Sequence, residues 1–131
     1  GSPMLLVGLV EDANEAYRSA MEDAHINNIG WNGQRISSGE DKAEGLFAIF
    51  DGHGGKETAD YATAHMGGHL SSALQACGGD GMRAMASAFE SLDSSIAHGP
   101  DYQESGATAV VAYIRKKLRG KGREMFVANA G

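Results

Sequence analysis

The hydrophobic pattern divides the chain into short strand-like runs and two helical repeats. Apolar runs of strand length cover residues 4–10 and 46–50, and residues 23–29 are also interpreted as a strand. Two later runs, 106–114 and 124–129, are rich in β-branched or small residues and also predict strands. With the helices between the two groups, the predicted order is three strands, two helices and two strands.

From residue 56 the apolar positions recur at spacings of three and four, which predicts amphipathic helices. The first helix should end at Gly78-Gly79 and the second before Gly99-Pro100. The predicted buried positions are Ala59, Ala62, Met66, Leu70 and Leu74 in the first helix, and Met82, Met85, Phe89, Leu92 and Ile96 in the second. A short turn joins the two helices, so we expect an antiparallel pair with its methionines filling the core.

Strands and helices are segregated along the sequence, which predicts an α+β fold rather than alternating parallel units. We therefore expect antiparallel strands with the antiparallel helix pair on one face of the sheet. Gly1-Ser2-Pro3 ahead of Met4 has the form of a cloning scar, which leaves residues 4–131 as the natural part. The chain stops at Gly131 in or just after a predicted strand, so we expect an incomplete domain.

The 131 residues, at 13.7 kDa, suffice for one domain with a real core. Seventeen acidic and 11 basic residues give a formal net charge of -6, which argues against nucleic acid and anionic membranes as partners. We interpret the basic cluster at 115–123 as a solvated hairpin connection rather than a phosphate-binding patch. The single Cys77 excludes an internal disulfide and fits a reducing compartment, so we expect an intracellular protein of the cytoplasm or nucleus.

The stretch 46–55, LFAIFDGHGG, is the most distinctive of the chain. An apolar strand pattern is followed by Asp51, His53 and three glycines before the helical period begins. Glycine permits close approach of the backbone to a ligand, so chemistry at this strand end is one interpretation. An ordinary strand-to-helix turn is the other.

Several common catalytic motifs do not fit the sequence. The glycines of 46–55 match neither a dinucleotide fingerprint nor a P-loop. A Ser/His/Asp combination could be drawn from Ser19, His53 and Asp51, but no nucleophile elbow is present. His65 and His69 are four residues apart, yet the other ligands of a zinc protease are missing, and we interpret them as a solvated helix face.

An oxygen-rich set of groups remains: Glu22 and Asp23 at one strand end, with Asp51 and the Gly52 carbonyl at another. Carboxylates and carbonyls are the ligands that Mg²⁺ and Mn²⁺ prefer. Arg18 is close enough in sequence to face an anion above such a metal. The alternative is that the acidic residues merely edge the sheet.

Four segments together resemble the type 2C, metal-dependent Ser/Thr protein phosphatases: RSAMEDAH at 18–25, LFAIFDGHGG at 46–55, SGATAV at 105–110 and FVANAG at 126–131. The resemblance extends over the chain from Met4. It implies a central β-sandwich with an antiparallel helix pair on each outer face, of which this chain would form the N-terminal part. It also implies Mg²⁺ or Mn²⁺ as cofactors, with a metal-bound hydroxide that attacks the phosphoryl group of a phosphoprotein.

The resemblance also assigns roles to individual residues. Asp51 resembles the carboxylate that bridges two metals, and Glu22 and the Gly52 carbonyl resemble the remaining protein ligands of one of them. Arg18 resembles the phosphate clamp, for which a planar two-pronged donor is well suited. His53 resembles the general acid that protonates the leaving Ser or Thr oxygen, a task suited to imidazole.

Asp23 lies next to these ligands in sequence, and we expect it to orient one of them. The resemblance places the carboxylates that complete the second metal site beyond Gly131. We therefore expect this chain alone to be weakly active or inactive. The alternative function is a non-enzymatic half-domain whose exposed strand edges form a homodimer or pair with the missing C-terminal half.

Overall fold

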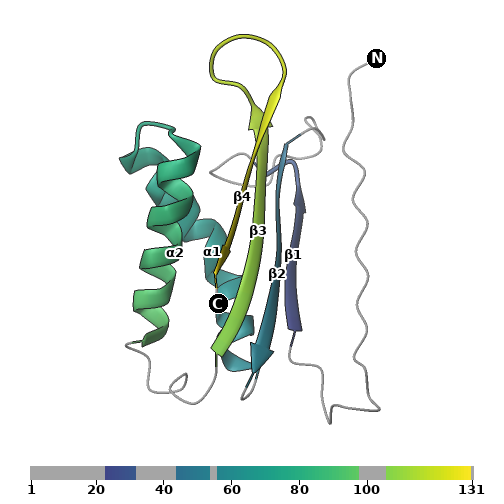
Figure 1. Ribbon diagram of the computed structural model, residues 1–131, viewed down its shortest axis with the longest axis vertical. Coiled ribbons are helices and arrows are strands. Elements are labelled where there is room, and N and C mark those ends of the chain that lie inside the picture. Colours follow the sequence, from purple (N-terminus) through teal and green to yellow (C-terminus); the bar gives the residue numbers. More distant parts are fainter. Residues whose placement is uncertain (1–22, 32–43, 54–55, 98–105, 131) are drawn as a thin grey trace.

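The computed structural model describes residues 23–31, 44–53, 56–97 and 106–130. It contains four strands and two helices in the order β1 (Asp23–Ile29), β2 (Gly45–His53), α1 (Glu57–Ala76), α2 (Gly81–Ala97), β3 (Gly106–Lys116) and β4 (Arg123–Ala130) (Figure 1). The predicted α+β fold is confirmed. The strand predicted at 4–10 lies outside the described residues.

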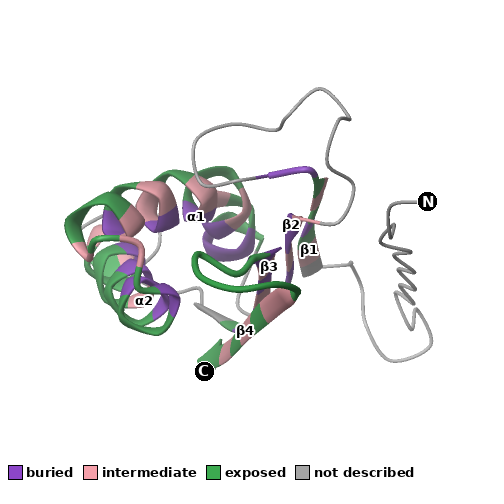
Figure 2. Ribbon diagram, turned by 90° about the horizontal axis from the view of Figure 1, so that it is seen from above, coloured by how far each residue is buried: buried purple, intermediate pink, exposed green. Residues whose placement is uncertain are grey.

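The four strands form one antiparallel sheet in the order β1-β2-β3-β4. The helix pair covers one face of this sheet, and its buried positions face the strands and the partner helix (Figure 2). The predicted antiparallel helix pair on one sheet face is therefore confirmed. Among the described residues, neither helix combines the length and hydropathy needed to cross a bilayer.

Strand β2 is longer than the sequence pattern predicted. It continues beyond Phe50 through Asp51 and Gly52 to His53, because this end of the strand is paired on one or both sides. Asp51 is the register partner of Asp23 on β1, and His53 is the register partner of Gly106 on β3. The predicted strand end at residue 50 was thus wrong by three residues, and Asp51 occupies a strand position rather than a turn.

The turn between the helices follows from its sequence. Gly78 and Gly79 have φ values of 61° and 88°, and glycine reaches this region without strain. The Gly79 N–H donates to the Leu74 carbonyl at 2.8 Å, which closes α1 in the predicted manner. Asp80 then caps α2, because its carboxylate accepts a hydrogen bond from the Arg83 N–H at 3.2 Å.

The core lies between the sheet and the two helices. Its largest fully buried side chains are Phe50, Leu46, Met66, Leu70 and Val111. The predicted apolar repeats supply most of the helical part, but Met82 is 73% exposed. Its predicted burial was wrong, because the buried stripe of α2 runs through Gly81, Met85, Ala88 and Leu92, and Met82 lies beside that stripe.

The opposite face of the sheet carries no helix in the described part of the chain. Successive residues of a strand point to opposite faces, so the neighbours of the core positions lie here. Ile49, Val110 and Val127 are 47%, 52% and 59% exposed on this face. We call it the open face of the sheet.

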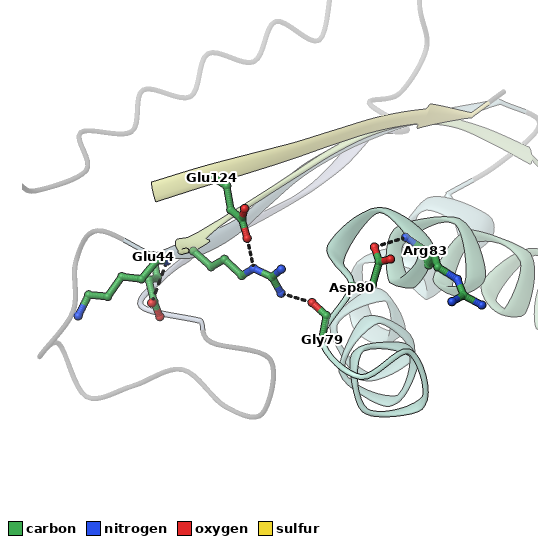
Figure 3. A network of polar contacts seen from close by, with 7 residues as sticks. Glu44, Gly79, Asp80, Arg83 and Glu124 are labelled. Atoms are coloured by element: carbon green, nitrogen blue, oxygen red, sulfur yellow. Dashed lines mark hydrogen bonds and ion pairs between the residues drawn. The ribbon is translucent and has the colours of Figure 1, made fainter. Parts of the chain in front are cut away.

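The prediction that residues 115–123 form a solvated connection was wrong for Arg115. This residue belongs to β3 and is only 8% exposed. Its Nε donates to Glu124 at 2.8 Å, and its Nη1 donates to the Gly79 carbonyl at 2.6 Å (Figure 3). The guanidinium also lies 5.0 Å from the ring centre of Phe126. Burial raises the pKa of the neighbouring Tyr113 above 10.0, and Arg115 offsets part of that rise. One side chain thus ties the sheet to the turn between the helices.

Gly81 provides a test of the packing between α2 and β4. A Cβ at this position would lie 2.5 Å from the Phe126 ring, which stacks on Tyr113 with centroids 6.0 Å apart. Gly81→Ala should therefore lower the free energy of unfolding by about 1–3 kcal/mol, because the ring must leave its place. Urea denaturation of the chain measures this change.

Gly68→Ala is the matched control, because nothing lies within 4 Å of the Cβ that it would add to α1. Here the higher helix propensity of alanine should raise the free energy of unfolding by about 0.5–1 kcal/mol. If both substitutions shift stability in the same direction, the close approach of Gly81 to Phe126 does not govern this interface.

Candidate metal and phosphate site

The site predicted from sequence lies at one end of the sheet. β1 and β3 begin there and β2 ends there, at the tip of the β2 arrow in Figure 1. Asp51 has Asp23 as its register partner on one side and Thr108 on the other. Two acidic positions on separate strands are thus brought directly opposite each other.

The side chains of β2 alternate between the two faces of the sheet, and this alternation determines on which face the Asp51 carboxylate lies. Phe50 and Gly52 are buried toward the helices, whereas Asp51 is exposed. Its side chain is therefore on the open face of the sheet. Gly52, the predicted carbonyl ligand, is paired with Ala107 of β3 and brings no side chain to this end of the sheet.

The structure describes only some of the other predicted site residues. Arg18 and Glu22 lie outside the described residues. For Asp23 and His53 the structure gives the strand positions, at the start of β1 and the end of β2. It brings Asp23, Asp51 and Gly52 to one sheet end, while the roles of these residues stay predictions.

The donor set at this end suits a hard cation. Asp23 and Asp51 are acidic positions in register, and a divalent cation held by Asp51 would offset the negative charge at this end of the sheet. Within the described residues, however, no three His, Cys, Asp or Glu side chains form a group that could hold a metal ion. Additional oxygen ligands would have to come from other parts of the polypeptide, as expected for Glu22.

Thr108 is a neighbour of the site to which sequence analysis gave no role. It is exposed and is the register partner of Asp51. Its hydroxyl can donate to a carboxylate or accept a hydrogen bond from a water molecule. The signal in the sequence was its place in the SGATAV segment, but only the strand register relates it to Asp51.

His65 and His69, the other histidine pair considered in the sequence, contact different partners in the structure. The ring of His65 lies 4.1 Å from that of Tyr61, on the same helix. His69 is half-buried, and its Nδ1 lies 3.0 Å from the Ser91 hydroxyl of α2. The predicted solvated face is correct for the exposed His65, whereas His69 links the two helices.

With this geometry in place, similarity to known proteins decides the family. The family model described as protein phosphatase 2C matches residues 7–131. The chain belongs to this family. The residues that carried the resemblance, from 18–25 to 126–131, all lie within the matched range.

Protein phosphatase 2C relatives match nearly the whole chain. Protein phosphatase 2C homolog 1 of Schizosaccharomyces pombe is 31% identical over 130 residues, which cover 96% of this chain and 35% of that protein. Probable protein phosphatase 2C 17 of Arabidopsis thaliana is 34% identical over 118 residues, covering 86% of this chain and 36% of its own length. The chain thus spans about a third of these protein phosphatase 2C relatives.

A solved structure agrees with the assignment to protein phosphatase 2C. A sex-determining protein of C. elegans superposes with a TM-score of 0.60 and 27% sequence identity, over 75% of this chain and 24% of that chain. This similarity supports the arrangement of the antiparallel sheet and helix pair. Members of the protein phosphatase 2C family generally use Mg²⁺ or Mn²⁺.

Proposed function

We propose that this chain contributes the N-terminal part of the active site of a metal-dependent protein Ser/Thr phosphatase. One observation carries the proposal. Asp51, in the LFAIFDGHGG segment of a protein phosphatase 2C chain, is exposed at a sheet end directly opposite a second acidic position. A carboxylate in this placement would help to hold divalent cations, as the resemblance implies for Asp51.

Asp51, Glu22 and the Gly52 carbonyl would hold Mg²⁺ or Mn²⁺, with Asp23 orienting a ligand. When bound, such a metal acidifies water to supply a nucleophile near neutral pH and attracts the charge of phosphoryl oxygens. Arg18 would bind two oxygens of the phosphate and hold the phosphorus in line for attack. His53 would give its proton to the leaving Ser or Thr oxygen, which avoids release of an alkoxide.

The exposed apolar residues of the open face favour a catalytic domain that contains further strands. Ile49, Val110 and Val127 expose apolar surface on this face, which also carries the side chain of Asp51. In the sandwich expected for the family, a second sheet would cover this surface, and we propose that further strands do so and bring the remaining carboxylates. The matched relatives are named as phosphatases, which favours this role over a non-catalytic assembly module.

Metal removal tests the proposed function. The product of the complete reading frame that encodes this sequence should release phosphate from a phosphothreonine peptide in the presence of Mn²⁺. EDTA should abolish the release, and renewed Mn²⁺ should restore it, because the metal supplies the nucleophile. Phosphate release is followed with a colorimetric assay.

Arg18→Ala provides a residue-specific arm of this experiment. It should raise KM and lower kcat, since the phosphate clamp binds the substrate and also positions it. The matched control is Arg83→Ala, an exposed arginine of α2, which should change neither constant. Phosphate release that persists without divalent metal, or that is insensitive to Arg18→Ala, would overturn the assignment.

A further inference from the structure

The positive charge of the chain is concentrated in one short segment. Residues 115–123 contain six of the 11 basic residues and no acidic residue. The remainder of the chain then carries 17 acidic and five basic residues, a formal charge of -12. We call residues 115–123 the basic hairpin.

The basic hairpin is an ordered projection at the end of the sheet away from Asp51 (Figure 1). Lys116 pairs with Arg123 in the strand register, and the Lys117 N–H donates to the Gly122 carbonyl at 3.0 Å. Gly120 and Gly122 have φ values of 82° and 93°, which permit the tight reversal. A hydrogen-bonded hairpin holds its charges in place before any partner arrives, which lowers the entropy cost of binding.

The cations of the basic hairpin divide into anchoring and exposed groups. Arg115 is committed to Glu124 and the Gly79 carbonyl. Lys117, Arg119 and Lys121 are exposed, and none of them forms a salt bridge within the described part of the chain. Structural needs of the fold therefore account for the buried cation but not for the three exposed ones.

We propose that the basic hairpin is a docking surface for an acidic segment of a partner protein. Aspartate and glutamate side chains of an extended peptide would pair with the three exposed cations, and the peptide could lie beside the half-exposed turn at Gly79. The surface lies at the end of the sheet opposite to the candidate metal site, so the partner would leave that site accessible. The proposal does not depend on phosphatase activity.

The negative charge of the rest of the chain determines which kind of anionic partner can bind to the basic hairpin. A duplex nucleic acid or an anionic bilayer is extended, and it would also meet the acidic remainder of the molecule, which repels it. An acidic peptide segment can contact the basic hairpin alone. Its attraction to the hairpin acts over about 8 Å at physiological salt, so the more distant acidic groups oppose it only weakly.

Charge reversal tests the proposal. Binding of a fluorescein-labelled octaglutamate peptide to the chain is measured by fluorescence anisotropy. The double variant Lys117→Glu/Arg119→Glu should weaken binding at least about tenfold, because two favourable pairs become repulsive. Raising NaCl from about 50 to about 300 mM should weaken binding to the unaltered chain by a similar factor.

Lys56→Glu/Arg83→Glu is the matched control, because it changes the net charge equally at two exposed positions outside the basic hairpin. This variant should bind the peptide as well as the unaltered chain does. Equal weakening by both double variants would show that net charge alone governs binding, and would overturn the proposal. Binding to phosphatidylserine vesicles or duplex DNA without binding to the peptide would also overturn it.

Discussion

Asp51→Asn should lower the metal-dependent phosphatase activity of the complete reading-frame product by at least about 10²-fold. This estimate follows the usual effect of losing one group that stabilises charge in the transition state. Asparagine keeps the shape of the side chain and one oxygen, but it loses the negative charge that attracts a divalent cation. Calorimetric titration of the variant with Mn²⁺ should show correspondingly weaker binding, and the phosphate-release assay measures the activity.

The same substitution should not destabilise the metal-free protein. Asp51 is exposed, and asparagine keeps a side-chain oxygen that accepts hydrogen bonds, so the free energy of unfolding should change by less than about 0.5 kcal/mol. An activity loss with unchanged or higher stability distinguishes a metal ligand from a structural carboxylate. Asp93→Asn, at an exposed position of α2, is the control and should leave both properties unchanged. Full activity in Asp51→Asn, or Mn²⁺ binding that survives it, would refute the ligand assignment.

The strength of the hydrophobic repeats explains why the elements could be predicted from the sequence. β1 has the predicted bounds, and the predicted stripe of the first helix is buried from Ala59 to Leu70 and partly buried at Leu74. Met82 continues the same repeat in α2 but lies beside the stripe of buried positions, which runs through Gly81 and Met85. A periodic pattern identifies the approximate apolar face of a helix, but packing against the neighbouring elements determines which positions of that face are buried.

Arg115 shows a second limit of sequence patterns. It follows Val111 and Tyr113 at intervals of two, so strand alternation places it on the buried face of β3. A run of basic residues nevertheless indicates a solvated loop. The burial of Arg115 depends on Glu124 and on the Gly79 carbonyl, which is 36 residues away, and this long-range contact leaves no local signal in the sequence.

The sequence motif and the strand register identified different residues of the candidate site. The LFAIFDGHGG segment identified Asp51 and Gly52, but its pattern placed them after the strand instead of within it. Only the pairing of β1, β2 and β3 shows that Asp23 and Thr108 flank Asp51. Strand register depends on packing across the whole sheet, and this is why sequence analysis overlooked Thr108.

Arg115→Met should lower the free energy of unfolding by about 2–4 kcal/mol, because it removes two charge-assisted hydrogen bonds. Methionine retains much of the apolar contact with Phe126, so the loss reports on the polar contacts rather than on a cavity. Urea denaturation of the 131-residue chain measures the change. Arg119→Met, in the exposed part of the basic hairpin, is the control and should shift stability by less than about 0.5 kcal/mol.

A double-mutant cycle with Glu124→Gln separates the two hydrogen bonds of Arg115. The Glu124 side chain is 31% exposed, so water can solvate part of its charge once Arg115 is gone. We therefore expect Glu124→Gln alone to cost only about 1 kcal/mol. The larger share of the Arg115→Met effect would then belong to the 2.6 Å bond with the Gly79 carbonyl, which joins β3 to the turn between α1 and α2. Equal losses in both single variants and in the double variant would instead place the whole effect in the ion pair.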